Sequence, residues 1–303
     1  MDGPQWGTRR GMLAALVAAL VLMIVTLSGP PAGRTIAGTA LPAAPAGSTP
    51  GDPQPKRWQP SRPPTPQHSA RLYVVKLEDH PLLTGNVRLA PVTCRLPRFG
   101  RDEARLRAYY VPVRDCLDEA WRAALSAAGL PWSSPKMNLA NDPGEVFCGD
   151  FDSAEFTAAY CPDTEMIFLP IDRITKVDRG SPAVHLGVLA HEYAHHVQAG
   201  VGILEAAYQR EDQVGRDSAA GQELSRRTEL QADCFAGLFL AAAAGRGNIS
   251  RHLAESAIGT FRFGTLAKTH GAGSVQHAWA RRGYVQATAA ACNTWAAPAS
   301  EVG

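Results

Sequence analysis

The sequence predicts an α+β fold: a mainly helical domain with a small β-hairpin, one strand of it an edge strand, ahead of its central helix. Apolar residues recur at helical spacing through the second half, and two short β-rich segments flank a Cys-Pro-Asp turn. With 303 residues, 45% of them hydrophobic and 19% charged, the chain can bury a sizeable core. The net charge of +2 gives no strong field, so we expect no nucleic-acid partner.

Residues 1–28 are predicted to be a signal peptide or a membrane anchor. Arg9 and Arg10 precede an apolar run that carries no charge from Gly11 to Gly33. The run is slightly long for the apolar core of a cleaved signal and just long enough to span a bilayer as an uncleaved anchor, and both alternatives remain open. In either case we expect the rest of the chain outside the cytoplasm, anchored by this single helix or secreted.

Residues 29–70 are predicted to be a disordered, proline-rich linker, and residues 71–303 the folded domain. Proline alternates in the linker with Gly, Ala, Ser and Thr, which cannot bury enough apolar surface to fold. In the folded domain, "RLYVVKLE" at residues 71–78 predicts a strand. Residues 111–129 predict a helix, with Pro112 near its start and Gly129 at its end.

Two short strands are expected next, at Ala158–Tyr160 and Met166–Leu169, on either side of the turn. A helix should follow, with Ser181 as its N-cap, Pro182 at its first position and Gly200 at its end.

After a polar connection, the sequence indicates further helical segments that complete the domain. These are a long helix over 218–245, a third helix over 250–261 and a closing segment over 278–295.

Six cysteines in an exported chain suggest three disulfides: Cys94, Cys116, Cys148, Cys161, Cys234 and Cys292. Proximity in the sequence favours Cys94–Cys116 and Cys148–Cys161, which leaves Cys234–Cys292. This is one of the fifteen pairings that six cysteines allow, and reduced thiols are the alternative.

The segment "LAHEYAHHVQAG", Leu189–Gly200, carries the chemistry. His191 and His195 are four residues apart, so on a helix they lie one turn apart on the same face. Both imidazoles can then reach one zinc ion at Zn–N distances of ~2.0–2.1 Å. Glu192 lies beside this pair, close enough to reach a water on the metal without binding the metal itself. This is the H-E-x-x-H arrangement of zincins.

A catalytic zinc normally has three protein ligands, and "ELQAD" supplies candidates for the third. Glu229 is the predicted ligand, with Glu223 as the alternative. Asp233, one turn further on, can accept a hydrogen bond from a ligating histidine and fix its tautomer, or it can be a simple helix pair or cap. The alternatives for the histidines themselves are a hydrogen-bonded core pair or a structural zinc site.

Other polar residues of the same helix are expected to be structural. His196 points to a different helix face from the ligand pair, so we expect it to pack or to support the site rather than bind metal. Tyr193 and His185 are also interpreted as structural.

The ligand set predicts a zinc metallopeptidase that acts on a peptide or protein substrate. Zinc lowers the pKa of its bound water toward ~7, and Glu192 takes the proton as the hydroxide attacks a carbonyl. Glu192 then passes the proton to the leaving amine. Such an enzyme needs an extended edge strand to hold the substrate backbone, and "EMIFLP" at 165–170 is the candidate.

Four blocks, "YCPDTEMIFL", "HEYAHHVQ", "ELQADCFAG" and "THGAGSVQHAWARRGYVQATAAACNTW", resemble the putative neutral zinc metallopeptidase family, bacterial envelope proteins with a gluzincin-like site. The resemblance runs from about Leu117 to Trp295. It implies His191, His195 and Glu229 as Zn2+ ligands and Glu192 as the catalytic base, and it supports paired cysteines. Ala194 stands where the family usually has Gly, but Ala is the better helix former, so the ligand geometry should survive.

His270, in "THG", is a candidate for a hydrogen bond to the oxyanion of the transition state, although it can equally be a local turn feature. A catalytically weak or inactive envelope protein, which uses the same fold for binding or scaffolding, is the alternative function. The intact Glu192 favours the enzyme.

Overall fold

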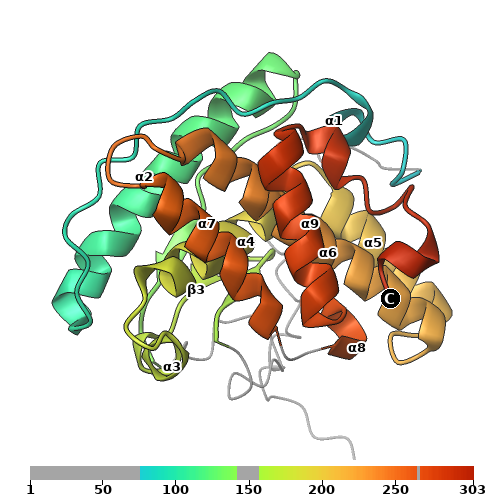
Figure 1. The fold of residues 1–303 in the computed structure, drawn as a ribbon. Coiled ribbons are helices and arrows are strands. Elements are labelled where there is room, and N and C mark those ends of the chain that lie inside the picture. The colour runs from blue at the N-terminus through green and yellow to red at the C-terminus, as the bar shows by residue number, and fades with distance from the viewer. Residues whose placement is uncertain (1–75, 142–156, 265–266) are drawn as a thin grey trace, which may run out of the picture. The chain divides into compact units, whose positions relative to one another are not determined.

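The computed structural model describes residues 76–141, 157–264 and 267–303, all of them within one compact unit, Pro64–Gly303 (Figure 1). The predicted targeting segment and linker, residues 1–28 and 29–70, lie outside the described residues, so both stay predictions. No helix in the described ranges is both long and apolar enough to cross a membrane.

The fold is a mainly helical α+β fold with a small three-stranded sheet, as predicted. Its helices are α1 Pro81–Thr84, α2 Glu103–Ala127, α3 Ile171–Val177, α4 Pro182–Gly200, α5 Ile203–Val214, α6 Ala219–Ala243, α7 Arg251–Thr260, α8 Ala267–His270 and α9 Gly273–Gln286. The strands are β1 Lys136–Asn138, β2 Ala159–Cys161 and β3 Met166–Phe168. Short 3-10 turns are η2 Phe261–Phe263, η3 Ala289–Cys292 and η4 Ala299–Glu301.

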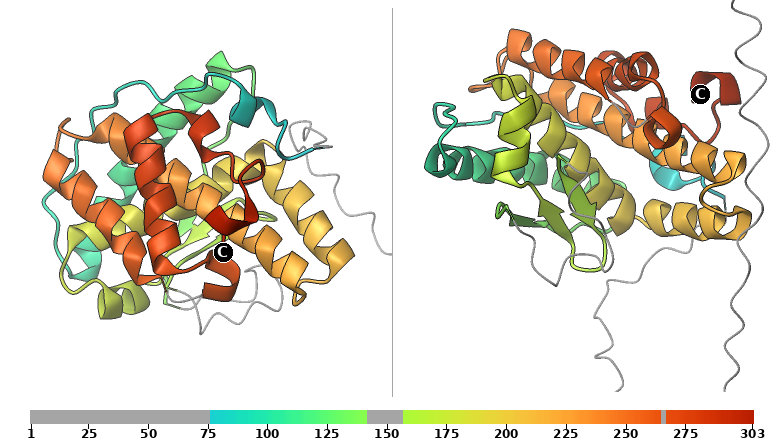
Figure 2. Two further views of the ribbon diagram at one scale, coloured as in Figure 1. Left: turned by 45° about the vertical axis from the view of Figure 1, so that its right-hand side comes forward. Right: turned by 90° about the horizontal axis from the view of Figure 1, so that it is seen from below.

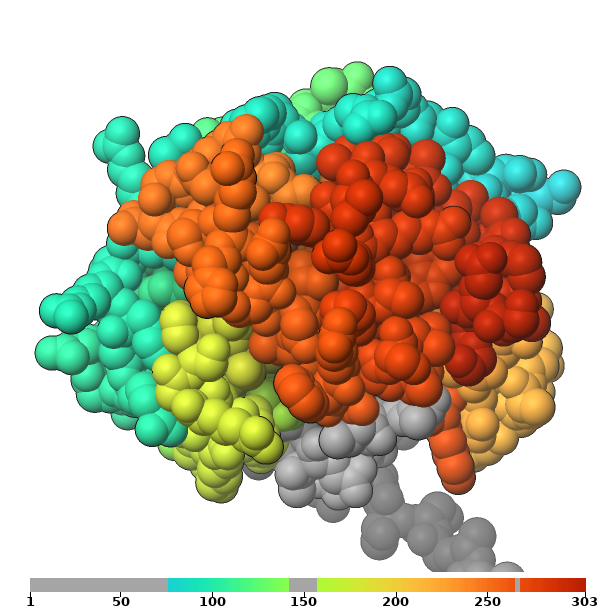
Figure 3. All heavy atoms as spheres, in the orientation of Figure 1, coloured from blue at the N-terminus to red at the C-terminus, as the bar shows by residue number. Residues whose placement is uncertain are grey.

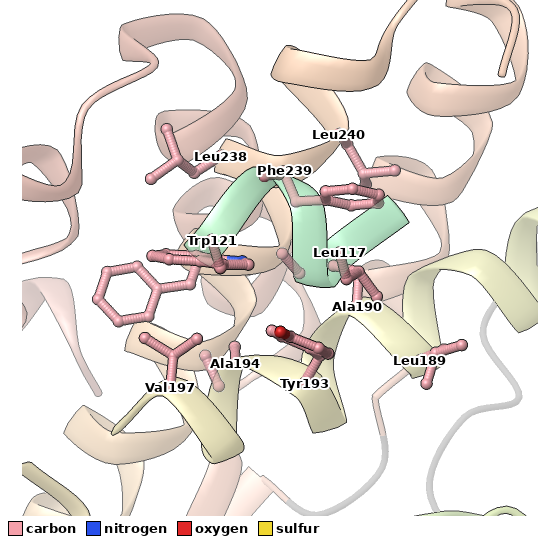
Figure 4. Packing of buried hydrophobic residues seen from close by; sticks show 14 of the residues in the cluster. Leu117, Trp121, Leu189, Ala190, Tyr193, Ala194, Val197, Leu238, Phe239 and Leu240 are labelled. Atoms are coloured by element: carbon pink, nitrogen blue, oxygen red, sulfur yellow. The ribbon is translucent and has the colours of Figure 1, made fainter. Parts of the chain in front are cut away.

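The helix that carries "HEYAH", α4, packs between α2 on one side and α6 on the other. Figure 4 shows this contact, where Leu117 and Trp121 of α2 meet the apolar face of α4 and residues of α6. Ala190 and Ala194 lie one turn apart on that face and are fully buried, so the neighbouring side chains can come close. Outside this apolar stripe, His191 and His195 reach polar groups of α6, and His196 reaches β2.

The ends of α4 follow from local chemistry. The Ser181 side chain accepts a hydrogen bond from Ala183 N, and Pro182 occupies the first turn, as predicted. Gly200 is the last helical residue, but the left-handed residue that follows the helix is Gly202, with φ 84°. The left-handed residue that ends the helix thus lies two residues later than predicted, and α5 begins directly after it.

The sheet has the order β1-β3-β2, with β3 in the middle. The strand β3 pairs antiparallel with β2 and parallel with β1. The two predicted strands are present within one residue of their expected bounds. The prediction that residues 165–170 form an edge strand is wrong, because β1 covers the far side of β3. Among the described strands the outer ones are β1 and β2, and β2 lies beside α4, with the strands on one side of the helices (Figure 2).

Three other predictions on the backbone needed correction. Residues 76–78, the described part of the strand predicted over 71–78, form a turn before α1. The helix predicted from residue 111 begins at Glu103, because Asp102 caps it by accepting from Arg105 N at 3.0 Å. The connection after α4, expected to be polar, is largely α5, a helix with Leu204 and Ala207 buried on one face.

Between described residues, the predicted disulfides Cys94–Cys116 and Cys234–Cys292 are present. Cys161 is also disulfide-bonded. Its expected partner, Cys148, lies outside the described residues. The first disulfide ties the segment before α2 to that helix, and the second ties α6 to η3.

Helices α6 and α9 touch backbone to backbone. A Cβ on Gly237 would lie 1.9 Å from Ala280 O, and a Cβ on Gly283 would lie 1.9 Å from Cys234 O, so only glycine fits at either position. The C-terminal segments, orange to red, form the centre of the face in Figure 3. The close contact between α6 and α9 gives α6, the helix that carries Glu229, a rigid support.

Candidate metal centre

Three polar side chains from two helices converge on one point. His191 Nε2 and His195 Nε2 of α4 are 3.1 Å apart, and each is 3.2 Å from Glu229 Oε2 of α6. In the described part of the chain, this is the group of ligand atoms close enough together to hold a metal ion. The structure therefore brings together the three residues predicted as ligands; their role as ligands stays a prediction.

The geometry of this group fits a zinc ion. With Zn–N and Zn–O bonds of ~2.0–2.1 Å, neighbouring ligand atoms of a tetrahedral site are about 3.3 Å apart, close to the spacing observed here. Glu229 Oε2 is buried and has no hydrogen-bond partner by geometry, although three imidazole nitrogens lie within 3.2 Å of it. A buried carboxylate oxygen without a partner is costly, and a cation at the centre of the group would satisfy it.

The far side of the His191 ring is held by a carboxylate. His191 Nδ1 lies 2.8 Å from Asp233 Oδ1, and Asp233 is only 2% exposed. Asp233 is one turn along α6 from Glu229, so a single helix supplies both groups. This is the contact that the sequence predicted for Asp233, and it turns Nε2 of His191 toward Glu229.

The far side of the His195 ring is held by a neutral amide that the sequence interpretation missed. His195 Nδ1 lies 2.8 Å from Gln198 Oε1, three residues further along α4. Gln198 is fully buried. An uncharged polar residue on the buried side of a predicted helix, one turn after a ligand candidate, was the available signal.

The electrostatics of the group favour a cation. Burial lowers the pKa of His191, but its contacts with Asp233 and Glu229 outweigh burial, so this pKa lies well above its usual value. Burial raises the pKa of Glu229, yet the contacts with the rings of His270, His195 and His191 together outweigh burial and hold this pKa well below its usual range. The Glu229 carboxylate thus stays negatively charged, and the rings of His191 and His195 beside it tend to bind a proton. A metal ion can supply this positive charge in place of the proton.

Glu192 is buried next to this group without belonging to it. It is 7% exposed, and it is not among the three residues whose ligand atoms converge. Burial raises its pKa, although His191 and His195 partly counteract this effect. A carboxylate with a raised pKa, close to a metal site but not needed to bind the metal, can accept and release a proton.

His270 lies on the more open side of the group. Its Nε2 is 3.1 Å from Glu229 Oε2, and its Nδ1 is 2.9 Å from Thr269 Oγ1. Its side chain is 29% exposed, more than those of the three clustered residues. The structure thus places His270 at the rim of the site, against Glu229; its contact with an oxyanion remains a prediction.

The remaining histidines and the tyrosine of α4 have other partners. His196 contacts Ser133 O at 2.8 Å and Tyr160 Oη at 3.0 Å, on the face of α4 that meets β2. Tyr193 donates its hydroxyl hydrogen to Asp118 at 2.7 Å.

His185 belongs to a buried cluster near the start of α4, away from the ligand group. Glu223, the alternative ligand, pairs instead with Arg227 at 2.8 Å.

Comparison with known proteins gives a family match over most of the described domain. The model of the family described as "Putative neutral zinc metallopeptidase" matches residues 101–295. The uncharacterized protein Rv2575 of Mycobacterium tuberculosis is 33% identical over 148 residues, 47% of this chain and 46% of that protein. The uncharacterized protein YpfJ of Escherichia coli K12 is 28% identical over 196 residues, 59% of this chain and 67% of that protein.

This chain therefore spans less than half the length of the mycobacterial relative that it matches. No solved structure matches the chain.

Proposed function

Starting from the fact that the chain belongs to the putative neutral zinc metallopeptidase family, we propose that it is a zinc-dependent peptidase that hydrolyses peptide bonds outside the cytoplasm. One observation carries this proposal. The Nε2 atoms of His191 and His195 and Oε2 of Glu229 form a triangle with sides of 3.1–3.2 Å, with the carboxylate of Glu192 buried beside it.

The residues of the triangle would hold zinc, and Glu192 would move the proton. Bound there, zinc would supply a lowered pKa for a coordinated water and polarisation of a substrate carbonyl. Glu192 would accept a proton at its carboxylate and release it to the leaving amine. Its raised pKa brings it closer to neutral pH, where a general base that must also act as an acid works best.

His270 would donate a hydrogen bond to the oxygen of the substrate carbonyl as negative charge develops on it. Its position at the rim suits this role, because it is more exposed than the residues below it. In the described structure its Nε2 faces Glu229, so this contact would have to lengthen as the substrate enters.

The substrate backbone would pair with an edge of the sheet. Because β3 is covered on both sides, the strand that can add a peptide beside α4 is β2, whose Tyr160 already contacts His196. This replaces the edge strand proposed from the sequence.

A location outside the cytoplasm, anchored by the N-terminal helix or secreted, is supported by two features. One is the apolar segment after Arg9 and Arg10, and the other is the disulfides, which persist in oxidising compartments.

The test is elemental analysis of the dialysed protein, followed by digestion of a peptide library with and without a chelator. We expect about one zinc per chain and cleavage that disappears when zinc is removed and returns when zinc is added back. Absence of bound metal would refute the zinc site. Bound zinc without any cleavage would favour the alternative, a binding or scaffolding protein that uses the same fold.

A further inference from the structure

A line of buried amide groups runs from the metal centre to the disulfide-bonded turn η3. It begins at His195, whose Nδ1 contacts Gln198 Oε1 at 2.8 Å. Gln198 Nε2 donates to Gln231 Oε1 at 3.0 Å and to Thr228 O at 2.9 Å. Gln231 Nε2 donates to Cys292 O at 3.1 Å. Both glutamine side chains are completely buried, so water cannot replace these contacts.

The direction of every hydrogen bond in this line is fixed from its far end. The carbonyl of Cys292 can only accept, so Gln231 must turn its NH2 group toward it and its oxygen toward Gln198. That oxygen and the carbonyl of Thr228 both accept, so Gln198 must present its NH2 group to them. Reversing either amide would bring two carbonyl oxygens together at 2.9–3.1 Å.

The oxygen of Gln198 is therefore left facing His195, and an amide oxygen can only accept. Nδ1 of His195 must then carry the hydrogen, and in the neutral ring Nε2 has the free lone pair. Nε2 is the atom that lies 3.1 Å from His191 Nε2 and 3.2 Å from Glu229 Oε2.

We propose that Gln198 and Gln231 form a positioning relay, which transmits the polarity of the Cys292 carbonyl to His195 and holds this ring in the tautomer that presents Nε2 to a metal. The proposal deepens the function proposed above and rests on it. Neither glutamine touches the substrate or the metal; both act through the orientation of His195.

The relay explains why the two ligand histidines have different supports. His191 is held by a carboxylate, Asp233, which fixes its tautomer and adds negative charge. A carboxylate at position 198 would meet Gln231 Oε1 and the carbonyl of Thr228, and it would add one more buried charge near Glu192 and Glu229. A glutamine fixes the tautomer of His195 without either penalty.

The first test determines the tautomer in the metal-free protein by nitrogen-15 NMR of the histidine rings, at alkaline pH where the rings are neutral. We expect hydrogen on Nδ1 of His195 in the wild-type chain, and a shift toward the Nε2–H form in Gln198→Met. His80→Leu is the control, because it removes two hydrogen bonds of another buried ring that touches no site residue. It should leave His195 unchanged.

Hydrogen on Nε2 in the wild type, or an unchanged Nδ1–H form in Gln198→Met, would overturn the relay. The wild-type measurement needs neither bound zinc nor hydrolysis, and it does not depend on whether a variant folds. A chain with the expected tautomer but no affinity for zinc would refute the proposed function and leave the tautomer assignment intact. A zinc-binding peptidase with hydrogen on Nε2 of His195 would refute the relay and leave the proposed function intact.

The second test measures zinc affinity by competition with a chromophoric chelator. Gln198→Met should weaken zinc binding roughly 10- to 100-fold, the range for losing a group that orients a ligand. Gln231→Met should have a smaller effect, because Gln198 keeps its bond to Thr228 O. His80→Leu should bind zinc like the wild type. Equal affinities in all four proteins, or a greater loss in Gln231→Met than in Gln198→Met, would contradict the relay.

Discussion

Two buried clusters on α4 combine an imidazole with a carboxylate, and they differ in how completely their polar atoms are paired. Near the start of the helix, His185 Nδ1 contacts Tyr110 Oη at 2.5 Å and His185 Nε2 contacts Asp178 Oδ2 at 2.9 Å. Asp178 also accepts from Arg101 and from Gly180 N. Both ring nitrogens and both carboxylate oxygens therefore have partners, and this cluster joins α2 to α4 as a closed unit.

The cluster further along the helix is open. His191 and His195 each have one ring nitrogen paired, to Asp233 and Gln198, and the other nitrogen faces Glu229 Oε2, which lacks a hydrogen-bond partner. The residue types in the two clusters are alike, so composition does not tell them apart. What separates a structural cluster from a candidate metal site is the set of acceptors left pointing at one another.

The largest expected effect comes from removing the charge of Glu229 in the open cluster. Glu229→Gln keeps the shape of the side chain but removes its charge, so zinc affinity should fall beyond the roughly 10- to 100-fold cost of losing a supporting group, and hydrolysis should disappear. Titration with zinc against a competing chelator measures this. Glu223→Gln, on the same helix and paired with Arg227, is the matched control and should bind zinc normally. Normal zinc binding by Glu229→Gln would show that the cluster is not the site.

The next prediction separates binding from proton transfer within the open cluster. Glu192→Gln should retain zinc, because Glu192 is not one of the converging ligands. Hydrolysis should fall by about 10²- to 10⁴-fold, the usual contribution of a positioned base. Parallel measurement of zinc content and of kcat/KM on a cleavable peptide tests both halves. Undiminished turnover with full zinc occupancy would remove Glu192 from the mechanism.

The third prediction concerns the closed cluster. His185→Leu removes one of the partners of Asp178 and the partner of Tyr110, so the free energy of unfolding should fall by about 1–3 kcal/mol, the cost of leaving a buried polar group without a hydrogen bond. Zinc affinity should not change. Urea unfolding followed by circular dichroism gives the first value, and chelator competition gives the second. If His185→Leu lowered zinc affinity as far as Glu229→Gln does, the two clusters would not have separate roles.

The same distinction shows what the sequence could reveal. Spacing alone placed His191, His195 and Glu229 on two helices, because caps and helical periodicity are local signals and identical side-chain spacing recurs at every turn. The strand β1 was missed because its three residues, "KMN", have no β-branched or alternating pattern, and only pairing with distant β3 makes them a strand. Without β1, residues 165–170 were interpreted as an edge.

The relay was missed for a related reason. Gln198 and Gln231 belong to different helices, and the backbone carbonyl that orients them comes from Cys292, far along the chain. The sequence shows two glutamines on helical segments, but it does not show that they meet, or that both are fully buried. Supports of this kind depend on tertiary packing, whereas the ligands depend on the helical repeat.

The smallest expected effect is a dependence of stability on pH that arises in the closed cluster. Burial lowers the pKa of His185 below its usual value, although Asp178 counteracts this. The unfolded chain therefore binds a proton at this ring at higher pH than the folded chain does. The stability that comes from the neutral ring is complete above about pH 6.5, and it is lost as the pH falls from there through the folded pKa.

Asp178 adds a second window at lower pH. Burial raises its pKa, but the hydrogen bonds from Gly180, His185 and Arg101 together outweigh burial and hold the pKa below its usual value. Its contribution is present above about pH 3.9 and is lost as the pH falls through the folded pKa. The titration of each group thus lowers the stability of the folded chain as the pH falls.

The difference in unfolding free energy between the wild type and His185→Leu should consequently shrink as the pH falls below about 6.5. Urea unfolding of both metal-free proteins at a series of pH values measures it, and subtracting the two curves cancels the titration of groups that they share. A difference that stays constant down to pH ~4 would mean that the ring has the same proton affinity folded and unfolded. The closed cluster would then not hold His185 neutral, and its contrast with the open cluster would rest on geometry alone.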